Sequence, residues 1–102
     1  KTSTFQDRLK KLAMFAELLP EYIEYKGVQP RGTMSRGEQI KWKFPNGWGA
    51  SLVNHMPFGS YENEFAVLKD GRVSYDNPIT NDVLGYVEVA DVALYLARIR
   101  GF

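Results

Sequence analysis

Residues 40–56 read I-K-W-K-F-P-N-G-W-G-A-S-L-V-N-H-M, and their pattern decides the fold that the sequence predicts. Ile40, Trp42 and Phe44 alternate with two lysines, which is the period of a strand with one buried and one solvated face. Pro45-Asn46-Gly47 then interrupts the alternation with residues that favour a tight turn. The sequence therefore predicts an antiparallel hairpin over residues 40–56.

The length of the hairpin loop sets which side chains face each other. A three-residue loop, with Gly47 in the left-handed conformation after a type I turn, places Phe44 opposite Trp48. The other pairs that follow are Trp42 with Ala50 and Ile40 with Leu52. All the large apolar side chains then share one face, whereas a two-residue Asn-Gly loop would move Trp48 to the lysine face. The three-residue loop is the prediction.

An amphipathic helix is predicted at each end of the chain. Ser3 and Gln6 have the spacing of a capping box that starts the first helix. Its apolar stripe is Phe5, Leu9, Leu12, Ala16 and Leu19. The second helix has acidic residues in its first turn, arginines in its last turn and Gly101 as a C-cap. Its apolar positions are Val89, Val92, Tyr95, Leu96 and Ile99.

Two segments between these elements are ambiguous. In residues 21–27, a preceding proline and a final glycine suit a short helix, although Ile23 and Tyr25 alternate as in a strand; we favour the helix. Residues 27–39 contain three glycines and a proline, which predicts an exposed loop. Loops of this length in a compact domain tend to be either functional or disordered.

A second hairpin is predicted around Asp70-Gly71, between the runs at residues 65–68 and 72–75. A two-residue loop pairs Leu68 with Val73. A three-residue loop pairs Val67 with Val73 and Phe65 with Tyr75. Both registers give a buried apolar face, so the sequence leaves the choice open.

The order of these elements predicts an α+β fold. It is a four-stranded antiparallel meander of two hairpins, flanked by an N-terminal and a C-terminal helix in a single domain of residues 1–102. The 44% hydrophobic and 25% charged content is ordinary for a soluble protein, and no apolar run is as long as a membrane span. The absence of cysteine excludes disulfides and thiolate chemistry.

A basic region is the strongest candidate for binding. Lys41 and Lys43 share the solvated face of their predicted strand, next to a loop that carries Arg31 and Arg36. Such a patch can contact phosphates or an acidic protein surface, although edge lysines also discourage aggregation. The net charge of +1 gives no global argument for a nucleic-acid partner.

The sequence contains no catalytic, metal or cofactor signature. His55 is the single histidine, with Glu62 and Glu64 following it, but no nucleophile with a partnered base can be named. One histidine with scattered carboxylates does not supply the ligands of a zinc site, and no phosphate-binding glycine loop follows a strand. We expect no cofactor.

Three blocks of the sequence share their spacing with a known group of proteins. They read K-F-P-N-G-W-G-A-S at residues 43–51, F-A-V-L at residues 65–68, and Y-D-N-P-I-T-N-D-V-L-G-Y at residues 75–86. Together they resemble small uncharacterised proteins encoded by tailed bacteriophages. The resemblance implies a phage origin and a place in the cytoplasm of the host bacterial cell. It brings no known activity, so no functional residue follows from it.

These observations favour non-enzymatic binding. The expectation is a phage-type accessory protein that acts on a host protein or complex, for instance by inhibiting a host defence complex, with Arg31, Arg36, Lys41 and Lys43 at the contact. The alternative is a stand-alone nucleic-acid or nucleotide binder that uses the same cations. A third reading is a small hydrolase or transferase around His55. The oligomeric state does not follow from the sequence.

Overall fold

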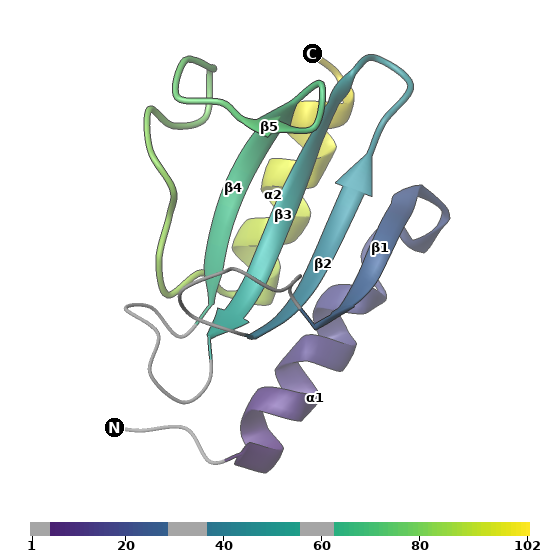
Figure 1. The fold of residues 1–102 in the computed structure, drawn as a ribbon, viewed down its shortest axis with the longest axis vertical. Helices are drawn as coiled ribbons and strands as arrows, with labels where there is room; N and C mark the ends of the chain where they lie inside the picture. Colours follow the sequence, from purple (N-terminus) through teal and green to yellow (C-terminus); the bar gives the residue numbers. More distant parts are fainter. Residues whose placement is uncertain (1–4, 29–36, 56–62) are drawn as a thin grey trace.

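The computed structural model describes residues 5–28, 37–55 and 63–102, and it shows an antiparallel sheet with two helices (Figure 1). The elements are α1 (Phe5–Ala16), the 3-10 turn η1 (Pro20–Tyr22), β1 (Ile23–Val28), β2 (Gly37–Lys43), β3 (Trp48–His55), β4 (Glu64–Lys69), β5 (Arg72–Val73) and α2 (Val89–Arg100). The sheet has the order β1-β2-β3-β4-β5, and each strand is antiparallel to its neighbours. The predicted α+β class is confirmed. The predicted count of four strands is wrong, because the described sheet has five.

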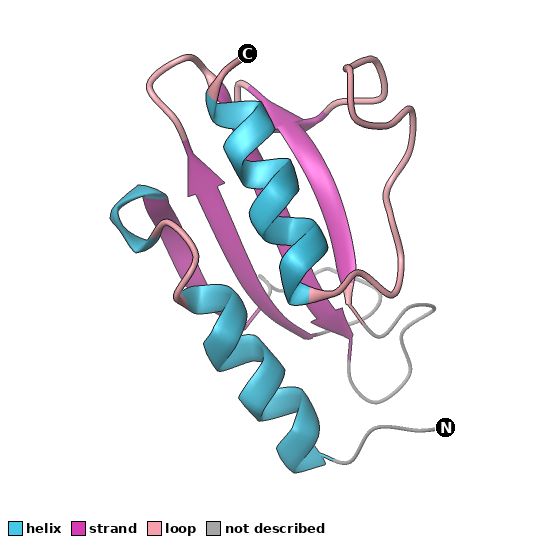
Figure 2. Cartoon of the chain, turned by 180° about the vertical axis from the view of Figure 1, so that it is seen from behind, coloured by secondary structure: helices cyan, strands magenta, loops and turns pink. Residues whose placement is uncertain are grey.

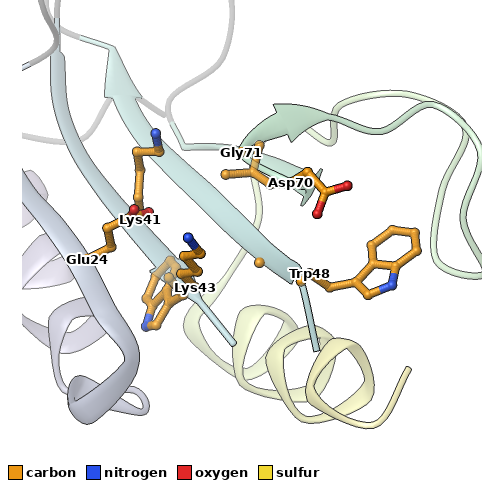
Figure 3. Close-up of a pocket in the computed structure, with 10 residues that line it drawn as sticks. Glu24, Lys41, Lys43, Trp48, Asp70 and Gly71 are labelled. Atoms are coloured by element: carbon orange, nitrogen blue, oxygen red, sulfur yellow. The ribbon is translucent and has the colours of Figure 1, made fainter. Parts of the chain in front are cut away.

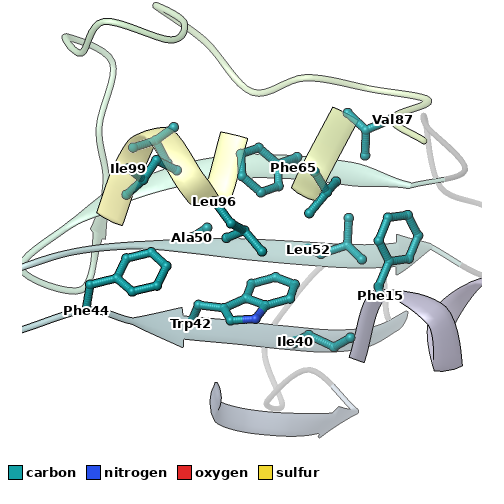
Figure 4. Packing of buried hydrophobic residues seen from close by; sticks show 12 residues of the cluster. Phe15, Ile40, Trp42, Phe44, Ala50, Leu52, Phe65, Val87, Leu96 and Ile99 are labelled. Carbon is teal, nitrogen blue, oxygen red and sulfur yellow. The ribbon is translucent and has the colours of Figure 1, made fainter. Parts of the chain in front are cut away.

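The core lies between the helices and one side of the sheet, which we call the helix face. Figure 2 shows α1 and α2 in front of that side, and Figure 4 shows the side chains that fill the space between the layers. Phe15 comes from α1, and Leu96 and Ile99 come from α2; all three are fully buried. The sheet contributes Ile40, Trp42, Phe44, Ala50, Leu52, Phe65 and Val67. We call the other side of the sheet the open face.

The first hairpin has the predicted loop and register. Trp42 pairs with Ala50 and Ile40 with Leu52. The Phe44 N–H donates to the Trp48 carbonyl oxygen at 2.8 Å, and the Gly47 N–H donates to the Phe44 carbonyl oxygen at 3.1 Å. Gly47 has a φ of +86°, the left-handed conformation that the three-residue loop requires. This prediction is confirmed.

Replacing Gly47 with alanine is expected to lower the free energy of unfolding by about 1 kcal/mol, because an L side chain is strained at positive φ. The new methyl group would also lie 3.3 Å from the Asp70 carboxylate. Gly101→Ala is the control, since Gly101 has a φ of −93° and the nearest atom would be at 3.5 Å. Urea denaturation of the two variants measures the difference. Equal midpoints would contradict the left-handed turn.

Residues 20–28 differ from the predicted short helix. Only Pro20–Tyr22 form a helical turn, and Ile23–Val28 form β1, which pairs with β2. Pairing with β2 satisfies the backbone groups on one edge of this segment, while the Tyr22 ring packs edge-on against Phe44 with ring centroids 5.1 Å apart. The predicted loop over residues 27–39 is therefore shorter, and its residues 29–36 lie outside the described part of the chain.

The second hairpin has the two-residue loop, one of the two registers left open by the sequence. Leu68 pairs with Val73, and both Asp70 and Gly71 have positive φ values. This is the conformation expected of an Asp-Gly turn between twisted strands. β5 ends at Val73, and the Tyr75 side chain is 60% exposed.

The helices agree with prediction at most of their positions. α2 begins after Glu88, which forms a capping box with Asp91, and Gly101 is its C-cap. α1 ends at Ala16, earlier than the predicted stripe, because Leu19 adopts a left-handed conformation ahead of η1. The predicted cap at Ser3 lies outside the described residues.

The loop of the first hairpin also holds the end of α2. The Asn46 amide nitrogen donates to the carbonyl oxygens of Ile99 at 3.0 Å, Arg100 at 3.2 Å and Phe102 at 3.3 Å. Its Oδ1 accepts a hydrogen bond from the Trp48 N–H at 3.0 Å. One side chain thus contacts three carbonyl groups at the end of α2, where a helix leaves carbonyl groups without intrahelical partners, and it fixes the helix to the sheet.

Candidate functional site

Two lysines lie together on the open face. Lys41 and Lys43 occupy alternate positions of β2, and the residues beside them, Ile40, Trp42 and Phe44, are buried on the helix face. Lys43 is exposed and Lys41 is half-buried. Neither ammonium group forms an ion pair or hydrogen bond with another described residue. Within the described part of the chain, no ion pair therefore neutralises their charges.

A hollow of about 100 Å³ lies beside these lysines. Figure 3 shows Lys41 and Lys43 on one side of it and Asp70 with Gly71 on the other. This volume is smaller than the roughly 300–1,000 Å³ of typical small-molecule sites. The hollow can accept the end of a side chain, whereas a nucleotide is too large for it.

Gly49 explains why the hollow exists. Along one row of the open face, Lys43 pairs with Gly49 and Gly49 pairs with Leu68, so the middle position of the row has no side chain. A Cβ atom at Gly49 would lie only 2.1 Å from the Trp42 carbonyl oxygen, which is shorter than any real contact. The backbone geometry therefore admits only glycine there.

Two carboxylates also line the hollow. Glu24 comes from β1, and Asp70 comes from the turn between β4 and β5. Neither carboxylate lies within 4.0 Å of the Lys41 or Lys43 ammonium group. The rim of the hollow therefore carries two positive and two negative charges that are not joined in ion pairs with each other. The sequence does not point to these acids, because the predicted short helix contains Glu24 and because Asp70 is distant along the chain.

Of the predicted basic region the structure describes only the two lysines, and the aromatic residues beside them are mostly buried. Arg31 and Arg36 lie outside the described residues, so the structure brings together Lys41 and Lys43 alone among the predicted four. Trp42 and Phe44 are 0% and 2% exposed and belong to the core, so they offer no surface for stacking a base. Trp48 is half-buried; Phe102 packs edge-on against its ring at 5.0 Å, and the Lys69 ammonium lies 4.7 Å from the ring centroid.

The third reading, a catalytic site around His55, falls on side chains that lie outside the described part of the structure. His55 is the last residue of β3. Glu64, the first residue of β4, pairs with Val53 of β3. Glu62 lies outside the described residues. Among the residues that the structure describes, no group of three or more histidine, cysteine, aspartate or glutamate side chains could hold a metal ion.

Comparison of this chain with protein-family models, curated proteins and solved structures finds no match. The candidate site therefore has to be interpreted from its own geometry. Neither α1 nor α2 is long and apolar enough to cross a membrane, and the same holds for every helix among the described residues.

Proposed function

We propose that this chain is a small non-enzymatic binding protein whose open face contacts a protein partner through Lys41 and Lys43. The observation that supports this most strongly is a pair of ammonium groups beside the hollow over Gly49, neither of which forms an ion pair with another residue that the structure describes. The resemblance to phage-encoded proteins suggests that the partner is a host protein or complex in the bacterial cytoplasm. Inhibition of a host defence complex by occlusion of its surface would suit so small a chain.

The charge on the rim favours a protein partner over nucleic acid. Glu24 and Asp70 would repel a run of phosphates but would complement the mixed charges of a protein surface. Trp42 and Phe44 are buried, so these two side chains cannot form the aromatic platform that single-strand binders use.

The size of the hollow suggests how contact is made. A carboxylate side chain of the partner can lie between the two ammonium groups, with its stem over Gly49 and against Leu68. Charged pairs that are partly removed from water at the centre of an interface contribute more than pairs on an exposed rim. Glu24 and Asp70 would then limit which neighbouring groups the partner can present.

The test is a pull-down from host lysate with tagged wild-type protein and with Lys41→Glu/Lys43→Glu. We expect wild type to retain its partner after nuclease treatment, and we expect the double variant to lose at least about tenfold in affinity, which corresponds to about 1.4 kcal/mol. Rising salt should weaken the wild-type complex, because exposed charges are screened over about 10 Å at 0.1 M.

The matched control is Lys10→Glu/Arg72→Glu, which also changes the net charge by four units, from +1 to −3. Lys10 lies on α1, and Arg72 pairs with Lys69, whose side chain is on the helix face over Trp48. Equal loss in both double variants would show a general charge effect and would contradict the proposed contact. Loss of the partner on nuclease treatment would favour the nucleic-acid alternative.

A further inference from the structure

The surface of α2 that faces away from the sheet is unusually apolar. Val92, Leu96 and Ile99 are buried against the sheet, as expected for a surface helix. On the outward side, Leu94 is 60% exposed and is accompanied by three exposed alanines, Ala90, Ala93 and Ala97. A helix with one exposed side normally places polar residues there.

A groove continues this apolar surface towards α1. It measures about 360 Å³ and is lined by Glu17, Leu18, Leu19, Ala93, Leu96, Ala97 and Arg100. Met14 on α1 is itself 50% exposed. We call the combined surface the helical patch: Met14, Leu18, Leu19, Ala90, Ala93, Leu94 and Ala97. It lies on the helices, away from the open face and its lysines.

Besides Arg100, which lines the groove, two opposite charges border the helical patch on α2. Asp91 in the first turn and Arg98 in the last turn are seven residues apart, about two helical turns, so they project from the same side of the helix. Both are exposed. Asp91 Oδ2 accepts a hydrogen bond from the Glu88 N–H at 3.3 Å, and Arg98 Nη2 donates a long one to the Pro78 carbonyl oxygen at 3.4 Å. Neither residue forms an ion pair with another described residue.

We propose that the helical patch is an interface between two copies of this chain, with their α2 helices packed antiparallel. In a two-fold symmetric pair the same surface meets itself, so Asp91 of each copy faces Arg98 of the other. Leu94 lies near the midpoint between these charges and packs beside the two-fold axis on the alanines of the second copy. Parallel packing would instead place Asp91 against Asp91 and Arg98 against Arg98.

Sedimentation equilibrium of purified protein tests the association over concentrations up to about 1 mM, the weak limit of specific binding. We expect wild type to reach the mass of two chains. We expect Leu94→Glu to weaken association at least tenfold, because it places a charge at the apolar centre. Tyr75→Glu is the matched control, since Tyr75 is also 60% exposed but lies outside the helical patch. It should associate as wild type does.

The charge pairs give a second test that depends on the antiparallel orientation. Arg98→Glu should weaken association, because it places a carboxylate against Asp91 of the other copy, where the wild-type chain has a guanidinium group. Adding Asp91→Arg to that variant exchanges the two charges and should restore association. Asp91→Arg also removes the capping contact to Glu88, so thermal melts followed by circular dichroism must show that each variant is folded at the temperature used.

The outcomes test the association and the antiparallel orientation separately. A wild-type mass of one chain at every concentration would overturn the proposal, as would equal association of Leu94→Glu and Tyr75→Glu. Association that survives in folded Arg98→Glu, or that is not restored by the exchange, would overturn the antiparallel arrangement. Loss in Leu94→Glu together with restoration in the exchange variant would establish it.

Discussion

Replacing Trp42 with alanine is expected to lower the free energy of unfolding by about 3–5 kcal/mol. Trp42 is fully buried in the middle of the core, so truncation leaves a cavity between the sheet and α2. Its indole N–H donates to the Leu18 carbonyl oxygen at 2.7 Å, and removal leaves that carbonyl without this partner. Because domains of this size are stable by only about 5–15 kcal/mol, much of the total stability would be lost.

Trp42→Phe helps to distinguish the contribution of the core contacts from that of the hydrogen bond to Leu18. Phenylalanine keeps most of the apolar contact but lacks the donor to Leu18, so its loss should be clearly smaller than that of alanine. Urea denaturation followed by circular dichroism gives both values. If the alanine variant lost less than about 1 kcal/mol, the central position of Trp42 in the core would be wrong.

Replacing Gly49 with alanine is expected to cost about 3 kcal/mol, the upper end for overpacking. The added Cβ would lie 2.1 Å from the Trp42 carbonyl oxygen and 3.3 Å from the Lys43 Cα. These are backbone atoms, so β2 and β3 would have to separate locally to admit one methyl group. The same movement would displace Lys43 and change the hollow on the open face.

Gly27→Ala is the control for Gly49→Ala, because it makes the same change within a strand. The new methyl group there would meet the Tyr25 hydroxyl at 3.1 Å, the far end of a side chain that can rotate away. We expect a change of less than about 0.5 kcal/mol. Thermal melts of the two variants compare them directly, and a similar loss in both would show that the close approach at Gly49 does not limit stability.

The first hairpin was predictable because its signals are local. The loop residues Pro45-Asn46-Gly47 and the alternation beside them agree on a single register, and the structure has that register. The end of α2 was predictable for the same reason, since Gly101 and the preceding arginines lie within one turn of each other.

β1 was not predictable, because its stability comes from β2. Ile23 and Tyr25 alternate as in a strand, but two residues are too short a pattern to decide between strand and helix, and the register shift between them is visible only in the paired backbone. Pro20 and Gly27 favour a helix, which only Pro20–Tyr22 partly form. The sequence could not decide between the two registers of the second hairpin either, since both gave an apolar face. The choice depends on the backbone conformation of the turn, which the structure shows.

Of the residues around the hollow, the sequence predicted only the two lysines. Lys41 and Lys43 follow from the alternation within one strand. Glu24 and Asp70 reach the same hollow through pairing of β1 with β2 and of β3 with β4, which no local pattern reports. The role of Gly49 depends on its distance to a carbonyl on the neighbouring strand.

The hydrogen bonds from Asn46 to the end of α2 have a consequence for folding during synthesis. Residues 40–55 leave the ribosome well before residues 89–102, so the hairpin can form while α2 does not yet cover its apolar face. Nascent chains at this stage expose hydrophobic surface and are prone to aggregation or chaperone binding. Arrival of α2 then covers that face, and its carbonyl groups at Ile99, Arg100 and Phe102 reach the Asn46 amide already positioned in the loop. The loop between β2 and β3 is thus the docking point for the end of α2.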